Sequence, residues 1–354
     1  MKLKHKEWID RIKRLRGAKE SRYKTLRLEK NERVTPFSSG FWKKAVKNIT
    51  PERILAYPEP EGFYRKLSKF YGMSAGHFVL TAGSDAAIRN GFDLCVKPGD
   101  AVVTLKPTFA MVEVYCELYN AKKRLVSYNR DLSLDIDALL GSIDKKASLV
   151  VLANPNSPTG TYIDNATMEK IIRRAKQFGA VVLVDEAYYG FCPKTCLALV
   201  ERFDNLMITR TFSKACGMAG LRIGYIIACP SLAELLYKFR PMYEVNSMAL
   251  LFAETALDNW KETNTYIKET VAGKDYLIKE LKRLGFSYVE TRANFIHIDF
   301  KNKKKAAQQL FEQQEIRVRG GLALPGYESF LRITLGPKPA MRKFVQALEA
   351  LCRS

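Results

Sequence analysis

The sequence predicts an α/β fold with a mostly parallel sheet, and three observations lead to this prediction. Short apolar runs rich in β-branched residues alternate with amphipathic helical stretches through the middle of the chain, as in sheets covered by helices on both faces. The composition of the 354 residues, 47% hydrophobic and 27% charged, is that of a globular protein. Near residue 245 the pattern changes to long helices and fewer strands, which indicates a second, smaller α+β domain.

The elements follow from these patterns in chain order. The expected strands are the runs at 77–81, 101–105, 148–152, 181–184, 206–210 and 223–228. Helical spacing appears between several of them, at 85–95, 110–119 and 166–178. After 245 we expect helices at 248–284, 305–314 and 338–352 and strands at 293–299, 316–319 and 330–334. The predicted division is a large doubly wound domain, 46–245, and a small domain made of 1–45 and 246–354.

The positive charge is concentrated at the N-terminus. Residues 1–27 carry a net charge of +8 out of the total of +21. Trp8, Ile9, Ile12 and Leu15 recur at helical spacing, so the segment is expected to be a basic helical arm. Such an arm either lies on the body of the protein or contacts a membrane surface or RNA. We favour the first, because most helices of this kind pack on the body with their charged face in solvent. A basic surface also suits an anionic substrate.

Several classes of protein are disfavoured by the composition. No run of about 18 apolar residues predicts a transmembrane helix, and the first residues lack the apolar stretch of a secretory signal. Seven dispersed cysteines with no CxxC pair are typical of reduced thiols, which predicts a cytoplasmic protein. Three distant histidines offer few ligands for a metal, and no metal site is expected.

Chemically distinctive residues follow five of the expected strands at their carboxyl ends. In open α/β sheets, ligands bind beyond this edge, so five such groups predict one ligand site. The groups are Gly83-Ser84-Asp85, Pro107-Thr108-Phe109, 154–160 (NPNSPTG), Asp185-Glu186-Ala187-Tyr188 and Thr211-Phe212-Ser213-Lys214, with Arg222 eight residues further on.

One part of this site fits a phosphate group. The turn at Gly83 leads into a helix, and the first N–H groups of that helix, at Ser84 and Asp85, favour an anion. Plain turn chemistry is the alternative interpretation of these three residues. The side chains that would complete the phosphate cup are the hydroxyls of Thr211 and Ser213 and the guanidinium of Arg222.

The remaining residues fit a flat heterocycle with an aldehyde. Phe109 offers a face for ring stacking. Asp185 ends a buried strand, where a carboxylate is costly unless a cation such as a protonated ring nitrogen pairs with it. Lys214 lies in a positive environment that disfavours its ammonium form, so its free amine is available for a Schiff base. Together with the phosphate cup, these groups predict a site for pyridoxal phosphate.

A series of short motifs carries a family resemblance that covers about residues 24–350. The motifs are LEKNE (28–32), YPEPEG (57–62), TAGSD (81–85), KPGD and PTF (within 97–109), NPNSPTG (154–160), VDEAY (184–188), TFSKACGMAGLRIGY (211–225) and LRITLG (331–336). In this order the chain resembles the fold-type I pyridoxal-phosphate aminotransferases of classes I and II, most closely the histidinol-phosphate aminotransferase-like branch. The resemblance implies the fold-type I architecture, with a large cofactor-binding domain and a smaller α+β domain.

The resemblance also implies roles for individual residues. Lys214 would hold the cofactor as a Schiff base and move the proton, Asp185 would keep the ring nitrogen protonated, and Tyr188 would bond the phenolate oxygen. Tyr57 would reach the cofactor phosphate of the neighbouring subunit, which implies a homodimer with shared sites. For the substrate, Arg332 would bind a carboxylate, Arg319 (with Arg317 two residues away as the alternative) would bind a second anionic group, and Tyr23 is a further candidate contact.

The chain departs from the family pattern at two places. An asparagine usually precedes Pro-Thr-Gly and contacts the phenolate oxygen, whereas this chain has Ser157 there, so either Ser157 or Asn156 makes the contact. The N-terminal motif usually reads Asn-Glu-Asn-Pro, whereas 31–36 reads NERVTP. Because that segment covers the substrate in the family, a different substrate cover is expected.

The expected activity is transfer of an amino group between an anionic amine or amino acid and a 2-oxo acid. Phosphorylated, phosphonate-bearing, aromatic and imidazole donors all suit two arginines, with histidinol phosphate as one example and 2-oxoglutarate as an acceptor. A decarboxylase of a phosphorylated amino acid, such as threonine phosphate, would use the same cofactor residues. A non-catalytic nucleic-acid-binding relative is the alternative from another class, but few residues precede the family match. No membrane partner is expected.

Overall fold

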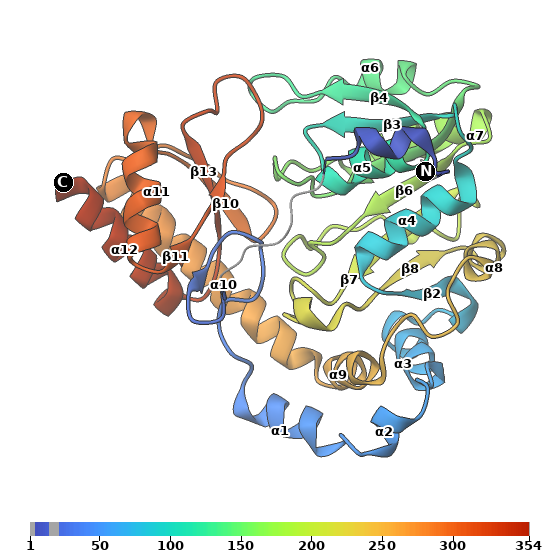
Figure 1. Ribbon diagram of the computed structural model, residues 1–354, viewed down its shortest axis with the longest axis horizontal. Coiled ribbons are helices and arrows are strands. Elements are labelled where there is room, and N and C mark those ends of the chain that lie inside the picture. The colour runs from blue at the N-terminus through green and yellow to red at the C-terminus, as the bar shows by residue number, and fades with distance from the viewer. Residues whose placement is uncertain (1–3, 14–20, 354) are drawn as a thin grey trace.

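A seven-stranded sheet forms the centre of the computed structural model, which describes residues 4–13 and 21–353 (Figure 1). The strand order is β2-β8-β7-β6-β5-β3-β4. The strands from β7 to β4 run parallel, and β8 is antiparallel to both its neighbours. The prediction of a mostly parallel α/β sheet is therefore confirmed. The strands are β2 (Phe78–Thr81), β3 (Ala101–Lys106), β4 (Lys122–Ser127), β5 (Ala147–Ala153), β6 (Val181–Asp185), β7 (Leu206–Thr211) and β8 (Gly224–Ala228).

Helices cover both faces of this sheet because its strands are apolar on both sides. Along β3, Val102 packs in one core and Val103 in the opposite one, as the alternation of a strand requires. One face is covered by α4 (Ser84–Cys95), α5 (Ala110–Leu118) and α8 (Pro230–Lys238). The other is covered by α3 (Glu61–Tyr71), α6 (Ile136–Gly141), α7 (Asn165–Gln177) and α9 (Ser247–Asp258).

One strand of the large sheet was not predicted. The edge strand β4 has the sequence KKRLVS, in which three charged residues precede the apolar pair. Only Val126 is buried there, so the strand lacks the continuous apolar run that marks its neighbours.

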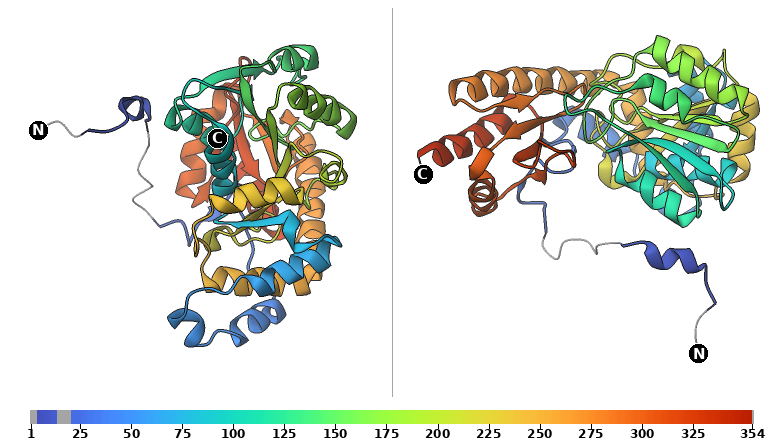
Figure 2. Two further views of the ribbon diagram at one scale, coloured as in Figure 1. Left: turned by 90° about the vertical axis from the view of Figure 1, so that its right-hand side faces the viewer. Right: turned by 90° about the horizontal axis from the view of Figure 1, so that it is seen from above.

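A second, four-stranded antiparallel sheet lies beside the first (Figures 1 and 2). Its order is β12-β13-β10-β9, and a separate apolar core joins it to three helices. The predicted helix at 248–284 is divided at Asn259 into two helices. The elements of this part are α10 (Trp260–Arg283), β9 (Tyr288–Val289), β10 (Phe295–Asp299), α11 (Lys304–Gln313), β11 (Ile316–Arg317), β12 (Arg319–Gly320), β13 (Phe330–Thr334) and α12 (Lys338–Arg353).

The N-terminal region joins the two parts of the molecule. Within the predicted arm, residues 4–13 contain a short 3₁₀ helix, η1 (Glu7–Arg11), and residues 14–20 lie outside the described part. Trp8 donates from Nε1 to the carbonyl oxygen of Leu118, 3.0 Å away, so η1 contacts α5. Residues 21–27 are not helical, and β1 (Leu26–Arg27) pairs with β11. The chain then passes through α1 (Ser39–Lys47) and α2 (Glu52–Leu55) into the large sheet.

Two absences hold for the described part of the chain, 4–13 and 21–353. None of its helices is long and apolar enough to cross a membrane. It contains no group of three or more His, Cys, Asp or Glu side chains arranged to hold a metal ion.

Candidate active site

A cavity of about 640 Å³ lies at the carboxyl edge of the large sheet. Its opposite wall comes from the N-terminal residues 29–32 and from β12 and β13. Chain segments far apart in sequence thus meet at the edge where a ligand was predicted. Twelve of the predicted site residues line the cavity, namely Ser84, Asp85, Phe109, Ser157, Asp185, Tyr188, Thr211, Ser213, Lys214, Arg222, Arg319 and Arg332.

The phosphate end of the cavity is built around the first turn of α4. Gly83 precedes the helix with a φ of +84°, a conformation that glycine adopts without strain. A Cβ at this position would lie 2.7 Å from Nη2 of Arg222, so only glycine lets that guanidinium approach the helix N-terminus. Ser213 accepts a hydrogen bond from Thr211 at 2.9 Å and a longer one from Arg222 at 3.4 Å. The helix N-terminus, two hydroxyls and one guanidinium therefore form a cup for an anion.

Asp185 ends β6 at the floor of the cavity and is buried. Its Oδ1 accepts a hydrogen bond from Thr209 at 2.7 Å, and among the described residues it forms no ion pair. Burial raises the pKa of Asp185 to about 6, although Thr209 and the charge of Lys214 lower it. A buried carboxylate of this kind gains stability from a cationic partner, and the protonated ring nitrogen of pyridoxal phosphate fits that place.

Lys214 follows β7 and extends into the same cavity. Its Nζ donates to the carbonyl oxygen of Lys30 at 2.9 Å. Burial, with a smaller contribution from the charge of Arg332, lowers the pKa of Lys214 to about 8. Much more of this amine is therefore unprotonated near neutral pH than in an ordinary lysine, which suits a lysine that acts as a nucleophile or a base.

Tyr188 is buried and bonds Ser157, one of the two alternative residues for the phenolate contact, as well as Asn31. Its hydroxyl oxygen accepts a hydrogen bond from Nδ2 of Asn31 at 2.8 Å, and the Ser157 side chain also bonds it. Burial raises the pKa of Tyr188, against the lowering effects of Arg332, Ser157 and Asn31. The phenol is therefore neutral at physiological pH and is able to donate a hydrogen bond.

Asn156, the other candidate beside Ser157, does not line the cavity. Its Nδ2 donates to the carbonyl oxygen of Pro107 at 3.0 Å and to Oγ1 of Thr159 at 2.8 Å. The side chain thus joins two loops of the large sheet. Ser157 is the residue of this pair that reaches the cavity.

Two arginines stand side by side at the wall opposite the sheet. Arg319 of β12 pairs in register with Arg332 of β13. Arg332 is partly buried, and its Nη2 donates to the carbonyl oxygen of Glu29 at 3.0 Å. Arg319 is exposed at the mouth of the cavity. Arg317 lies on β11 outside the cavity lining and faces Glu312 at 3.7 Å.

Two predicted contacts lie outside the cavity. Tyr57 is 73% exposed and stacks on Tyr243 with ring centroids 4.2 Å apart. Tyr23 is 89% exposed. A contact of either residue with a ligand therefore needs a movement or a second subunit.

The N-terminal motif was expected to cover the substrate, but the contacts that 29–32 make with Tyr188, Lys214 and Arg332 were not predicted. Asn31 has a φ of +57° and bonds both Tyr188 and Thr334, the latter 303 positions away. The LEKNE motif was the only signal for this contact, because no local pattern indicates such a distant partner. Glu113, on α5, lines the cavity and was not predicted either.

A second, larger hollow of about 860 Å³ lies between 131–136, 159–164 and 289–292. Thr159 and Gly160 of the predicted 154–160 group line it, but no residue with a predicted cofactor or substrate contact does. The convergence of Asp185, Lys214 and Arg332 therefore favours the smaller cavity as the active site.

The geometry agrees with the cofactor that the motifs imply. A cup that has room only for glycine at Gly83 and a buried carboxylate, that of Asp185, without an ion-pair partner among the described residues both lie around one cavity. The cup fits the phosphate of pyridoxal phosphate, and the carboxylate fits its protonated ring nitrogen.

Comparisons with known proteins point in the same direction. Residues 37–348 match the family model described as aminotransferase class I and II. The chain is 33% identical over 329 residues to histidinol-phosphate aminotransferase 1 of Carboxydothermus hydrogenoformans, covering 91% of this chain and 92% of that protein.

Solved structures share the fold. Histidinol-phosphate aminotransferase of Sinorhizobium meliloti, solved in complex with pyridoxal 5′-phosphate, has a TM-score of 0.82 at 22% identity and covers 92% of this chain and 90% of its own. L-threonine-O-3-phosphate decarboxylase of Porphyromonas gingivalis has a TM-score of 0.76 at 22% identity over 93% and 100% of the two chains. The fold alone therefore does not select the reaction.

Proposed function

Because the chain belongs to the family of class I and II aminotransferases, we propose that it transfers the amino group of an amine or amino acid with a second, anionic group to a 2-oxo acid. The protein is a pyridoxal-phosphate-dependent aminotransferase. Histidinol phosphate is the donor we propose first, since relatives with about one third identity carry that substrate in their names, and 2-oxoglutarate is the proposed acceptor. The observation that supports an anionic substrate is the pair Arg319 and Arg332 on the wall that faces Lys214.

We assign the cofactor contacts to the residues that line the sheet side of the cavity. When bound, pyridoxal phosphate supplies an aldehyde that accepts an amine and a ring that withdraws electrons from the bond to be broken. The cup of Gly83, Ser84, Asp85, Thr211, Ser213 and Arg222 would hold its phosphate, and Phe109 would lie against its ring. Asp185 would hold the proton of the ring nitrogen, while Tyr188 and Ser157 would bond the phenolate oxygen.

Lys214 is the proposed acid–base group. With cofactor and substrate bound, its neutral Nζ amine would take the proton from the substrate Cα and return it to the carbon on the other side of the transferred nitrogen. A pKa of about 8 makes the amine both a competent base and a competent acid near physiological pH. The carbonyl oxygen of Lys30 keeps Nζ in the cavity.

The substrate anion is assigned to the two arginines. Arg332 presents a guanidinium held by the carbonyl oxygen of Glu29, and planar two-point binding of a carboxylate or phosphate orients the substrate. Arg319, exposed at the mouth, would receive a charge at the far end of the substrate. Arg317 makes no contribution in this proposal because it lies outside the cavity.

We further propose a cytoplasmic homodimer with shared sites. Exposed apolar side chains accompany the stacked pair Tyr57 and Tyr243, namely Ile54, Leu55 and Met242, each at least 70% exposed. Exposed apolar surface of this kind is typical of an interface, and a partner would bring Tyr57 toward a neighbouring phosphate cup. All seven cysteines are free, as expected in a reducing compartment.

A donor screen with product analysis tests the function. Purified enzyme loaded with cofactor is mixed with histidinol phosphate, glutamate, aromatic amino acids or phosphonate-bearing amines, with 2-oxoglutarate as acceptor. We expect oxo product and glutamate in equal amounts from an anionic donor. Carbon dioxide release without oxo product would instead assign the site to decarboxylation, the reaction that the same cofactor residues also permit.

A further inference from the structure

Residues 28–36 are here called the cover segment, and 29–32 within it line the cavity on the side away from the sheet. Its backbone and one side chain contact three of the proposed functional residues within the stretch 29–31. The contacts are Arg332 Nη2 to the Glu29 carbonyl oxygen (3.0 Å), Lys214 Nζ to the Lys30 carbonyl oxygen (2.9 Å) and Asn31 Nδ2 to the Tyr188 hydroxyl oxygen (2.8 Å). The position of this segment therefore sets the position of the base, the phenol and the substrate arginine.

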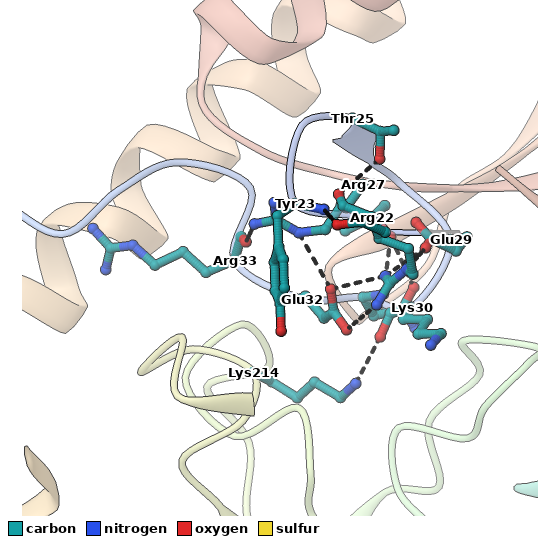
Figure 3. A network of polar contacts seen from close by, with 12 residues as sticks. Arg22, Tyr23, Thr25, Arg27, Glu29, Lys30, Glu32, Arg33 and Lys214 are labelled. Carbon is teal, nitrogen blue, oxygen red and sulfur yellow. Dashed lines mark hydrogen bonds and ion pairs between the residues drawn. The ribbon is translucent and has the colours of Figure 1, made fainter. Parts of the chain in front are cut away.

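The first half of the cover segment is held by Arg22. Figure 3 shows its guanidinium between the carboxylates of Glu29 and Glu32, with bonds to both. Arg27 lies 3.5 Å from Glu32 and also donates to the carbonyl oxygen of Arg33. These ion pairs are partly exposed, and such pairs contribute little to stability individually.

The second half is held by Arg33, whose side chain runs away from Lys214 (Figure 3). Its Nε donates to the carbonyl oxygen of Thr35 at 3.1 Å, and Nη2 donates to that of Pro36 at 3.1 Å and to Oε1 of Glu262 on α10 at 2.8 Å. The guanidinium also lies over the rings of Phe37 and Tyr266, at 4.7 and 4.3 Å from their centres. Arg33 is 9% exposed, so these contacts are made in a low-dielectric environment.

The same side chain touches the loop that carries the catalytic lysine. Gly217 in this loop has no room for a side chain, because a Cβ there would lie 2.4 Å from Cδ of Arg33. The amide of Gly217 donates to the carbonyl oxygen of Lys214 at 3.0 Å. The stem of Arg33 thus packs on the turn that follows Lys214, while its head fixes the cover segment to α10.

We propose that Arg33 is a positioning residue that fixes the cover segment and the Lys214 loop relative to each other, and so sets substrate binding at Arg332. The proposal rests on the function proposed above for the site. An unpaired cation would be costly at this depth, but Glu262 supplies the counter-charge. Although burial raises the pKa of Glu262, hydrogen bonds from Ser38 and the charge of Arg33 outweigh it and lower the pKa, so Glu262 stays ionised.

Only arginine satisfies all of these contacts. The planar guanidinium donates from Nε and Nη2 in fixed directions and stacks on aromatic rings, whereas an ammonium is a single, strongly hydrated point. We therefore expect Arg33→Lys to behave like Arg33→Met rather than like the parent enzyme. Arg124→Met is the matched control, since Arg124 makes a comparable contact with Asp144 and with the carbonyl oxygen of Ser142, far from the cavity.

Hydrogen exchange on the full-length enzyme loaded with cofactor tests the proposal without relying on activity. The amides of Asn31 and Val34 are bonded to Oγ1 of Thr334 and to the hydroxyl of Tyr266. In Arg33→Met and Arg33→Lys we expect these two amides to exchange at least about tenfold faster because local opening is easier. Peptides of the large sheet should exchange as in the parent enzyme, and Arg124→Met should leave 28–36 unchanged.

Kinetics supply the second readout. In both Arg33 variants we expect kcat/KM for the amino donor to fall about 10- to 100-fold, with a raised KM, because a small displacement of binding groups has effects of this size. The affinity for the cofactor should change less than about threefold, since its contacts lie on the sheet side. Unchanged exchange at Asn31 and Val34 together with an unchanged donor KM would overturn the proposal, as would the same losses in Arg124→Met.

Glu262→Gln keeps the test decisive if the Arg33 variants do not fold. It retains a hydrogen-bond acceptor and removes the counter-charge, so we expect the same changes in exchange and donor KM at about threefold or more. No change in this variant would also contradict the proposal. If the parent enzyme shows no amino transfer at all, the proposed function fails, whereas the exchange results still decide whether Arg33 fixes the cover segment.

Discussion

At the scale of single residues, burial brings two pKa values toward neutrality from opposite sides. It raises that of Asp185 to about 6 and lowers that of Lys214 to about 8. Both residues were predicted from the sequence, because each follows a recognisable buried strand and needs a partner there. The choice of Ser157 over Asn156 at the cavity was not predictable, since it depends on which way each side chain of one loop points.

Replacing Asp185 by Asn is expected to stabilise the cofactor-free protein while weakening catalysis. The folded-state pKa of about 6 lies above the ordinary 3.8, so the folded state holds this proton longer than the unfolded chain does. The free energy of unfolding of the parent therefore falls as the pH rises from about 4 to about 6, and this carboxylate lowers it no further above that range. This loss of stability amounts to at most about 3 kcal/mol, and the variant avoids it because Asn carries no charge.

Urea unfolding of the cofactor-free parent and of Asp185→Asn at pH 4 and pH 8 measures this difference. We expect the variant to be the more stable protein at pH 8 and the advantage to shrink at pH 4. Activity of the loaded variant should be at least about 100-fold lower, as for other electrostatic contacts to reacting groups. A variant that is less stable at pH 8 would contradict this prediction, because it would show that other groups of the protein already stabilise the charge of Asp185.

At the scale of elements, the site depends on where strands end and helices begin. The strand ends and the start of α4 were predictable because apolar runs and turn residues mark them locally. The edge strand β4 and the break of the long helix at Asn259 were not, since a charged edge strand and a single break leave little periodic signal. The cover segment was visible only as a motif, because its contacts reach the far end of the chain.

The N-terminus of α4 supports a prediction about cofactor affinity. Gly83→Ala puts a Cβ within 2.7 Å of Arg222 and strains a backbone with a φ of +84°. We expect the dissociation constant for pyridoxal phosphate to rise at least about tenfold because the phosphate cup is displaced. Gly99→Ala is the control, since Gly99 has a φ of +95° with open space around it. Equal affinities in the two variants, measured by equilibrium dialysis, would place the phosphate elsewhere.

At the scale of the whole molecule, the cavity belongs to neither sheet alone. The large sheet supplies Asp185 and Lys214, the small one supplies Arg319 and Arg332, and the cover segment lies between them. Alternation of strands and helices and the change near residue 245 predicted both sheets. The way they face each other and the place of Tyr57 on the outer surface depend on packing between distant segments, for which the sequence offered only a family resemblance.

The shared-site dimer is tested by mixing two inactive variants. Lys214→Ala lacks the base, and Tyr57→Ala lacks the proposed phosphate contact from the partner. In a two-fold dimer, a hybrid regains one complete site, made of Lys214 from one subunit and Tyr57 from the other. After unfolding and refolding an equal mixture, we expect about a quarter of the parent activity on statistical pairing. Activity no higher than that of the separate variants would contradict a site shared in this way.

The most direct test of the account is to locate the cofactor on the chain and to remove it with substrate. The loaded enzyme is treated with borohydride before and after exposure to an amino donor, and the peptide that contains Lys214 is weighed by mass spectrometry. We expect the reduced cofactor on Lys214 before exposure, its loss after exposure to a productive donor, and none in Lys214→Ala. Cofactor attached to another lysine, or retained on Lys214 with every donor, would contradict the assignment of this cavity as an aminotransferase site.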